Sequence, residues 1–130
     1  PHTSSRARYR AILSGKSRGV FNGRILVQQP AQKTNAELTN RNLLLNRGAE
    51  INTKPELEIY ADDVKCAHGS TTGQLDQSAL FYLLSRGIDQ QAARNMLVTA
   101  FASELLSNIR IPAIVEHTRE ALGAFRFSDA

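Results

Sequence analysis

The 130-residue sequence has a single cysteine, no tryptophan and no long apolar run. One cysteine excludes an intramolecular disulfide framework and fits a reducing compartment. It also excludes a Cys₄ or Cys₂His₂ zinc site built within one chain. No apolar stretch approaches the roughly 18–20 residues that a helix needs to cross a bilayer, so we predict no transmembrane helix. The 42% of hydrophobic residues is still enough for one folded domain.

Acidic residues are absent from the first 36 positions. That segment carries seven basic residues, a net charge of +7, whereas residues 37–130 carry nine basic and twelve acidic residues, a net charge of −3. Arg6, Arg8 and Arg10 alternate with other residues, which indicates a strand with its basic side chains on one face. This face could be solvated, bind phosphate or dock a protein. A nucleic-acid-binding β domain is therefore the alternative function.

Before about residue 75, short extended runs alternate with Gly, Asn, Ser and Pro. The predicted runs cover residues 8–13, 19–29, 41–45 and 56–61, and a fifth begins at 64–66. The polar residues 30–40 are predicted to form a loop. The apolar centres of the first four runs follow one another at irregular intervals and are Leu13, Leu26, Leu44 and Ile59. This spacing fits stacked rungs of a β-solenoid and equally an antiparallel sandwich.

Three segments rich in glycine and small polar residues predict changes of chain direction. Residues 46–48, Asn-Arg-Gly, predict a turn. Asn22-Gly23 predicts either a tight turn or a bend within the second run. Residues 69–73, Gly-Ser-Thr-Thr-Gly, lack the lysine of a phosphate loop, so they predict a turn whose hydroxyl groups satisfy the backbone.

After residue 75 the apolar spacing becomes helical. Asp76 predicts the N-cap of a helix over 78–86, with Gly87 just past its end and Leu80, Phe81 and Leu84 as its apolar stripe. Asp89 caps a second helix over 90–108, and Pro112 opens a weaker third helix to 122, before a frayed end at 123–130. The second helix has an apolar face formed by Ala93, Met96, Leu97, Ala100, Phe101 and Leu105. Any part of that face left uncovered would bind a partner.

The densest polar cluster is Asp-Asp-Val-Lys-Cys-Ala-His-Gly at residues 62–69, between the two halves. On a regular strand without a bulge at Ala67, Cys66 and His68 share one face, about 6.5–7 Å apart. A thiolate and an imidazole are a partial ligand set for iron or zinc, which other residues or another chain would complete. The alternatives are a buried cysteine beside a hydrogen-bonded histidine, and a Cys–His nucleophile pair.

Two segments resemble the signature of the Suf-type iron–sulfur cluster assembly scaffold family, the SufB/SufD family. They are LEIYADDVKCAHGSTTGQLD at residues 57–76 and LFYLLSRGI at residues 80–88. The Lys-Cys-x-His-Gly core is closer to the SufD branch than to the SufB branch. Residues 18–23 and 39–45 match as well, and the resemblance covers about residues 1–108.

This resemblance implies a mainly β fold with added helices. Residues 1–74 would be the last rungs of a right-handed parallel β-helix, and residues 75–130 a C-terminal helical domain of about three helices. The chain would then be the C-terminal third of a longer subunit.

The resemblance also implies a non-catalytic scaffold subunit. It would pair with SufB at the end of the β-helix and dock the ABC-type ATPase SufC through the helical domain. His68 and Cys66 would serve an iron–sulfur cluster that forms transiently at the SufB–SufD junction, with Lys65, Ala67 and Gly69 at that junction. The residues expected to build the helical core or to meet SufC are Phe81, Tyr82, Met96, Leu97, Phe101 and Leu105.

Several expectations about ligands and location follow from the same resemblance. The isolated fragment would retain no cofactor, and ATP would bind to the partner ATPase. A homodimer is expected when SufB is absent, whereas membrane and nucleic-acid partners are not. The location would be the bacterial cytoplasm or the plastid stroma.

Overall fold

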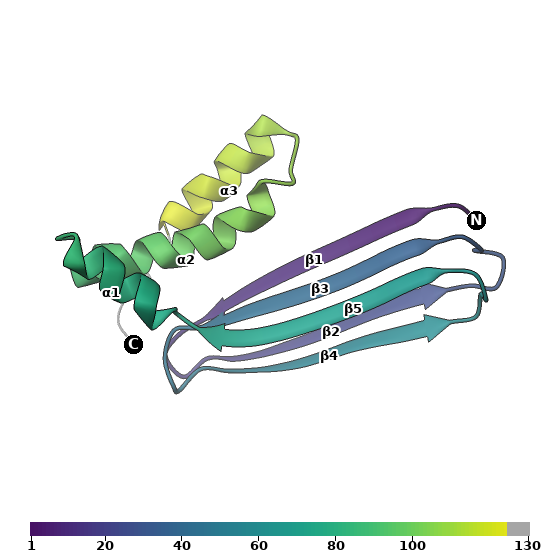
Figure 1. Ribbon diagram of the computed structural model, residues 1–130, viewed down its shortest axis with the longest axis horizontal. Helices are drawn as coiled ribbons and strands as arrows, with labels where there is room; N and C mark the ends of the chain where they lie inside the picture. Colours follow the sequence, from purple (N-terminus) through teal and green to yellow (C-terminus); the bar gives the residue numbers. More distant parts are fainter. Residues whose placement is uncertain (125–130) are drawn as a thin grey trace.

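The structure of the protein, a computed structural model, describes residues 1–124. Within this range five strands precede three helices. The strands are β1 (Ser4–Leu13), β2 (Arg18–Val27), β3 (Asn35–Leu44), β4 (Glu50–Ile59) and β5 (Lys65–Gln74). The helices are α1 (Gln77–Ser85), α2 (Gln90–Leu106) and α3 (Pro112–Ala124). Figure 1 shows the strands as a long two-layered body with the helices gathered at one end.

Strands that are two places apart along the chain pair in parallel. β1, β3 and β5 form one sheet in that order, and β2 and β4 form the second. Ser4 pairs with Asn35 and Asn35 with Lys65, whereas Arg18 pairs with Glu50. Because consecutive strands lie in opposite sheets, the chain winds as a parallel β-helix that leads into helices. The predicted fold class is confirmed.

The predicted runs need corrections in their bounds and in how they stack. Strand β1 begins at Ser4 rather than at residue 8, and β4 covers Glu50–Ile59 rather than residues 56–61. Consecutive runs do not stack on one another, because each coil consists of two strands and the interval from one run to the next is only half a coil. Residues 30–40 are not all loop, since β3 begins at Asn35. The hydropathy pattern of β3 is misleading because two of its inward residues, Asn40 and Asn42, are polar and nevertheless buried.

Gly23 lies inside β2, so the Asn22-Gly23 pair is not a turn. A Cβ atom on Gly23 would lie 2.8 Å from Cδ2 of Leu38 and 2.8 Å from Cζ of Phe21. Real Cβ atoms do not approach other atoms that closely, so glycine leaves the room that these two larger side chains fill between the sheets.

The turn predicted at residues 46–48 is confirmed, and the one at 69–73 is wrong. The first connects β3 to β4. There a Cβ atom on Gly48 would lie 2.7 Å from the backbone oxygen of Gly15 in the preceding coil. Residues 69–73 belong to β5 instead. Backbone pairing with β3 outweighs the turn preference of these small residues.

Alternate residues of each strand point into the space between the two sheets. On β3 the inward residues are the buried Ala36, Leu38, Asn40 and Asn42. Tyr9 of β1 meets Phe21 of β2 across this space, with ring centroids 5.0 Å apart. The interior is narrow, and β5 forms one edge of its sheet, so its inward side is largely exposed.

Local capping places the helices close to where the sequence predicts them. The Asp76 side chain accepts hydrogen bonds from two backbone N–H groups in the first turn of α1, and Asp89 does the same for α2. Gly87 has φ = +83° just after α1, and Pro112 begins α3. Of the expected frayed end, Gly123 and Ala124 are helical, and residues 125–130 lie outside the described residues.

The buried face of α2 agrees with the prediction only in part: Ala93 is buried, and Leu97 and Phe101 pack against the core. Val98 and Ala102 are buried, whereas Met96 is 50% exposed and Ala100 is also exposed. Val98 completes a small core with Leu43 of β3 and Leu75, which fastens the helices onto the outer face of the three-stranded sheet. The helical spacing of α2 allows two neighbouring apolar stripes, and only the position of that sheet decides between them.

The first helix shows a similar correction. Leu80 is buried as predicted, but Phe81 is 72% exposed and Leu84 is also exposed.

None of the described helices is long and apolar enough to span a membrane. The predicted division into domains at residues 74 and 75 stays a prediction.

Candidate functional site

Cys66 and His68 lie on one face of β5, as predicted. The pairing of β5 with β3 is continuous, from Cys66 opposite Ala36 through Ala67 opposite Glu37 to His68 opposite Leu38. No bulge interrupts this part of the strand. Because Ala36 and Leu38 point into the β-helix, Cys66 and His68 point to the same inward side.

This inward side lies at the open end of the β-helix. β5 is the outer strand of its sheet, so its second edge is unpaired in the described chain. Cys66 is partly buried and His68 is exposed. Ser70 Oγ lies 3.0 Å from Thr53 Oγ1 of β4, so the two sheets meet beside the pair. An incoming molecule could therefore reach both side chains from the open end.

The two side chains do not complete a metal site. Across the described residues, no three His, Cys, Asp or Glu side chains come together in a group that could hold a metal ion. A four-coordinate iron or zinc site needs further ligands, and a thiol with one imidazole supplies only two. The arrangement suits one part of a shared site.

The residues that flank the pair point the other way. Lys65, Ala67 and Gly69 alternate with Cys66 and His68 on β5 and therefore lie on its outer face. Lys65 and Ala67 are exposed there, and Gly69 is partly buried. They share the edge of the sheet with the candidate ligands but not the side on which a cluster would sit.

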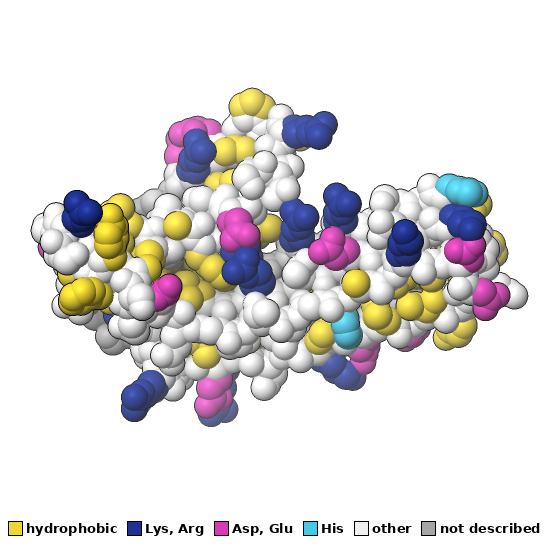
Figure 2. Space-filling view, in the orientation of Figure 1, with side chains coloured by type: hydrophobic (Ala, Val, Ile, Leu, Met, Phe, Trp, Pro, Cys, Tyr) yellow, Lys and Arg dark blue, Asp and Glu magenta, His cyan; other side chains and the backbone are white. Residues whose placement is uncertain are grey.

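The predicted partner-binding residues fall into two groups. Phe81, Tyr82 and Met96 are 72%, 55% and 50% exposed, so they form surface. Figure 2 shows hydrophobic side chains gathered over the α1 end of the molecule. Leu97 and Phe101 instead pack against the small core under α2. Leu105 is partly buried and lines apolar space between α2, α3 and β1.

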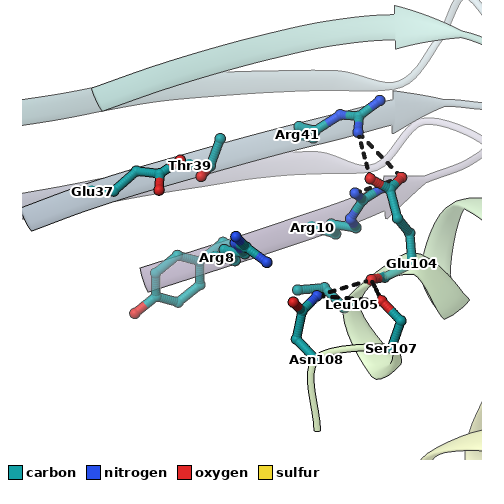
Figure 3. Close-up of a pocket in the computed structure, with 10 residues that line it drawn as sticks. Arg8, Arg10, Glu37, Thr39, Arg41, Glu104, Leu105, Ser107 and Asn108 are labelled. Carbon is teal, nitrogen blue, oxygen red and sulfur yellow. Dashed lines mark hydrogen bonds and ion pairs between the residues drawn. The ribbon is translucent and has the colours of Figure 1, made fainter. Parts of the chain in front are cut away.

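Acidic side chains lie beside the basic face of β1. Arg6, Arg8 and Arg10 share the outer face, as predicted, and a groove of about 320 Å³ lies between this face and the end of α2 (Figure 3). Glu37 and Glu104 also line that groove. The ion pairs made by basic residues of the first 36 positions are Arg6–Glu37, Arg10–Glu104, Arg18–Glu50, Arg24–Glu58 and Lys33–Asp63. This neutralisation weakens the nucleic-acid alternative.

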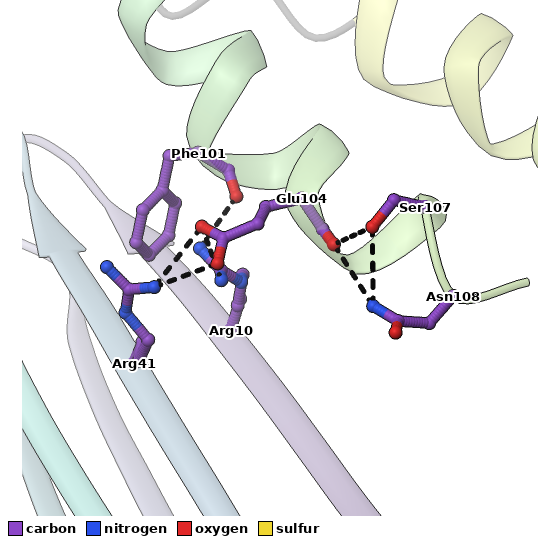
Figure 4. A network of polar contacts seen from close by, with 6 residues as sticks. All are labelled: Arg10, Arg41, Phe101, Glu104, Ser107 and Asn108. Atoms are coloured by element: carbon purple, nitrogen blue, oxygen red, sulfur yellow. Dashed lines mark hydrogen bonds and ion pairs between the residues drawn. The ribbon is translucent and has the colours of Figure 1, made fainter.

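Glu104 of α2 joins two arginines on neighbouring strands (Figure 4). Its carboxylate lies 2.7 Å from Arg10 Nη2 and accepts hydrogen bonds from Arg41 Nη1 at 3.1 and 3.2 Å. Arg10 also donates to the backbone oxygen of Phe101 at 2.9 Å and lies over its ring, 4.6 Å from the centroid. This network fixes the helices relative to the β-helix.

One pair of side chains on the far sheet has perturbed pKa values. A hydrogen bond from Lys54, 2.6 Å away, lowers the pKa of Glu56 and raises that of Lys54 itself. The attraction of the two charges acts in the same direction. Both side chains are at the surface, so salt screens the pair. They alternate with the inward residues of β4 and thus lie outside the β-helix, away from Cys66 and His68.

A polar network that was not predicted from the sequence lies beside the candidate ligands. Asn40 and Asn42 of β3 hydrogen-bond each other, Asn42 Nδ2 donates to Thr72 Oγ1, and Ser70 Oγ lies 3.2 Å from Asn40 Oδ1. Asn40 falls in the predicted loop, and Ser70 and Thr72 fall in the predicted turn. The period-two alternation of Asn40 and Asn42 with Ala36 and Leu38 was the signal that could have revealed the network.

Comparisons with known proteins agree with this architecture. Residues 1–101 match the family model for the SUF system FeS cluster assembly, SufBD core domain. The chain is 49% identical to the iron–sulfur cluster assembly protein SufD of Escherichia coli K12 over 120 residues, 92% of this chain and 28% of that protein. It is 44% identical to an iron–sulfur cluster assembly SufBD family protein of Synechocystis over 122 residues, 94% of this chain and 27% of the relative.

A plant protein is similar as well. The chain is 43% identical to the chloroplastic protein ABCI7 of Arabidopsis thaliana over 107 residues, 82% of this chain and 22% of that protein. The chain thus spans about a quarter of the length of these curated relatives. The family model matches residues 1–101, and the chain folds into a parallel β-helix followed by three helices. This chain therefore belongs to the SufBD family of SUF-system iron–sulfur cluster assembly proteins.

Proposed function

We propose that this chain is part of a non-catalytic, SufD-type scaffold subunit on which iron–sulfur clusters are assembled. The observation that carries the proposal is the pair Cys66 and His68, side by side on the inward face of an edge strand. A thiolate and an imidazole bind iron, and the cluster is the cargo of the assembly. The two donors are too few for a site of their own, which favours a site shared with a second subunit.

The second subunit would be SufB-like and would pair at the open end of the β-helix. The unpaired edge of β5 presents backbone N–H and C=O groups that another strand can use. Such pairing brings the inward face of the new strand over Cys66 and His68. Without the SufB-like subunit, a second copy of this chain would occupy the same edge.

His68→Ala in the full-length subunit tests the site. We expect the complex with the SufB-like subunit and the ATPase to assemble as before, because His68 is exposed. Loss of an iron ligand should lower the cluster content by roughly tenfold or more, as weakening even a metal site's supporting residues costs that much affinity. The measurement is iron and sulfide per complex after co-expression. His117→Ala, an exposed histidine on α3, is the matched control. Normal cluster content in His68→Ala would make the histidine structural.

The exposed apolar side chains of α1 would dock a SufC-like ATPase. Phe81 and Tyr82 are adjacent, and both are more than half exposed. The Arg86 guanidinium lies 5.2 Å from the centroid of the Tyr82 ring, which leaves the patch one positive charge at its rim. Aromatic and arginine side chains are the types that most often dominate binding energy in protein interfaces. The exposure of Phe81 and Tyr82 supports this docking surface. Leu97 and Phe101 pack against the small core instead, so we do not expect them to contact the ATPase.

Phe81→Ala should weaken binding of the ATPase subunit without unfolding the protein. An aromatic anchor in an interface is worth roughly tenfold or more in affinity, whereas truncation of an exposed side chain changes stability by only about 0.5 kcal/mol. Calorimetric titration of the full-length subunit with the ATPase measures the first, and thermal unfolding the second. Val20→Ala, 74% exposed on β2, is the control. Equal affinities for the two variants would place the docking surface elsewhere.

The proposed location is the bacterial cytoplasm or, in an organism with plastids, the stroma. The Arabidopsis relative is a chloroplastic protein, which supports the second possibility for plant-type members.

A further inference from the structure

Two asparagines are buried inside the coil formed by β3 and β4. Asn40 is 1% exposed and Asn42 is 3% exposed, and both point inward from β3. Asn40 Nδ2 donates to Asn42 Oδ1 at 3.0 Å, and Asn42 Nδ2 donates to Asn40 Oδ1 at 2.8 Å. Side-chain amides are rarely buried this completely, and they are tolerated only when they are hydrogen-bonded. The interior of the β-helix around Asn40 and Asn42 is therefore polar.

The polar interior continues onto β5. In the sheet, Asn40 lies opposite Ser70 and Asn42 opposite Thr72. Ser70 Oγ lies 3.2 Å from Asn40 Oδ1, and Asn42 Nδ2 donates to Thr72 Oγ1 at 3.2 Å. Each asparagine is thus linked to the residue one coil further on. We call Asn40, Asn42, Ser70 and Thr72 the polar ladder.

The two outer members of the polar ladder still have hydrogen-bonding capacity toward the open end. Thr72 Oγ1 accepts from Asn42, so its own O–H group can donate to another molecule. The Ser70 hydroxyl has two acceptor partners within reach, Asn40 and Thr53, and its lone pairs can accept from outside. Both residues are exposed, because no further strand covers β5 in the described chain.

A strand that pairs with β5 would bury these hydroxyl groups. Backbone hydrogen bonds alone do not select its register, because they form equally well after a slip along the strand. A slip of one residue, however, turns every side chain of the incoming strand to the opposite face. An apolar side chain over Ser70 or Thr72 would bury the free lone pairs of Ser70 or the O–H donor of Thr72 without a new partner, which is costly. Amide or hydroxyl side chains at two alternate positions avoid that cost.

We infer that Ser70 and Thr72 determine the register of the strand that pairs with β5, by hydrogen-bonding amide or hydroxyl side chains on an edge strand of the SufB-like subunit. Cys66 and His68 lie on the same inward row, at alternate positions before Ser70. Fixing the register at Ser70 and Thr72 therefore fixes which residues of the other subunit face the candidate ligands. Ser70 and Thr72 are positioning residues, and this role rests on the proposed pairing.

The test combines Ser70→Ala with Thr72→Val, which keeps the shape of the threonine and removes its hydroxyl. Thr71→Val is the matched control, because Thr71 is exposed on the same strand but points outward. The rescue variant combines Ser70→Thr with Thr72→Ser, which keeps both hydroxyls. All are made in the full-length subunit, and unfolding of each isolated subunit is measured to confirm that it folds.

The first readout is the affinity for the SufB-like subunit. We expect it to fall about tenfold or more in the double variant and to stay within about twofold in the control and the rescue. The second readout is disulfide trapping of Cys66 under an added oxidant, in a full-length subunit whose other cysteines are replaced, against single-cysteine positions along the partner strand. The wild type should favour one position, and the double variant should spread the yield over neighbouring positions.

Unchanged affinity together with an unchanged trapping pattern would overturn the register role and leave the pairing intact. Trapping of wild-type Cys66 only to a second copy of this chain would also overturn it. The strand that pairs with β5 would then not belong to the SufB-like subunit. Absence of any wild-type complex would instead refute the proposed pairing itself.

Discussion

Replacing Glu104 with glutamine should detach the helices partly from the β-helix and lower the free energy of unfolding by about 2 kcal/mol. The carboxylate neutralises Arg10, whose side chain is only 9% exposed, and also binds Arg41. Glutamine keeps the size and one acceptor oxygen but removes the negative charge, so the guanidinium charge of Arg10 loses its carboxylate partner and keeps only neutral ones, among them the Phe101 oxygen and ring. Glu104 itself is 57% exposed, so the cost is smaller than for a fully buried pair.

Urea unfolding of the full-length subunit measures this loss, and hydrogen exchange of the α2 amides shows whether it is local. Glu37→Gln is the control, because Glu37 lies 3.8 Å from Arg6 and both side chains are exposed. Exposed pairs contribute about 0–1 kcal/mol. If the free energy of unfolding fell by the same small amount in both variants, Glu104 would not anchor the helices. A loosened α2 should also weaken any coupling between the proposed ATPase-docking surface on α1 and the open end of the β-helix.

Replacing Asn40 with alanine should cost about 2–4 kcal/mol of stability. The change leaves a small cavity and removes one of the two hydrogen-bonding partners of the buried Asn42 amide. Unpaired buried polar groups are costly because water cannot replace the lost partner. Asn52→Ala, exposed on β4, should change stability by about 0.5 kcal/mol or less.

A double-mutant cycle with Asn42→Ala separates the network from simple loss of volume. We expect the two substitutions together to cost less than their sum by about 1 kcal/mol or more, because the second removes groups that the first had already left unpaired. Thermal and urea unfolding of the four proteins supply the cycle. Strict additivity would mean that the two amides act independently, despite hydrogen bonds of 2.8 and 3.0 Å between them.

The helices were predictable because their signals are local. Asp76 and Asp89 accept hydrogen bonds from residues two and three positions later, so the capping pattern is visible in a short stretch of sequence. The start at Pro112 needs no distant partner either. Strand β3 was only half found because its partners, β1 and β5, lie a full coil away along the chain, and no short window of sequence shows them.

By itself, the sequence determined the alternation on β5 and thus the shared face of Cys66 and His68, because a strand repeats every two residues. It also determined the helix boundaries to within two residues. Only the tertiary structure decided that this face lies at an open edge, that Asn40 and Asn42 are buried beside it, and that α2 buries Val98 rather than Met96. Those outcomes depend on how successive coils stack and on where α2 meets the sheet, which are contacts between segments distant along the chain.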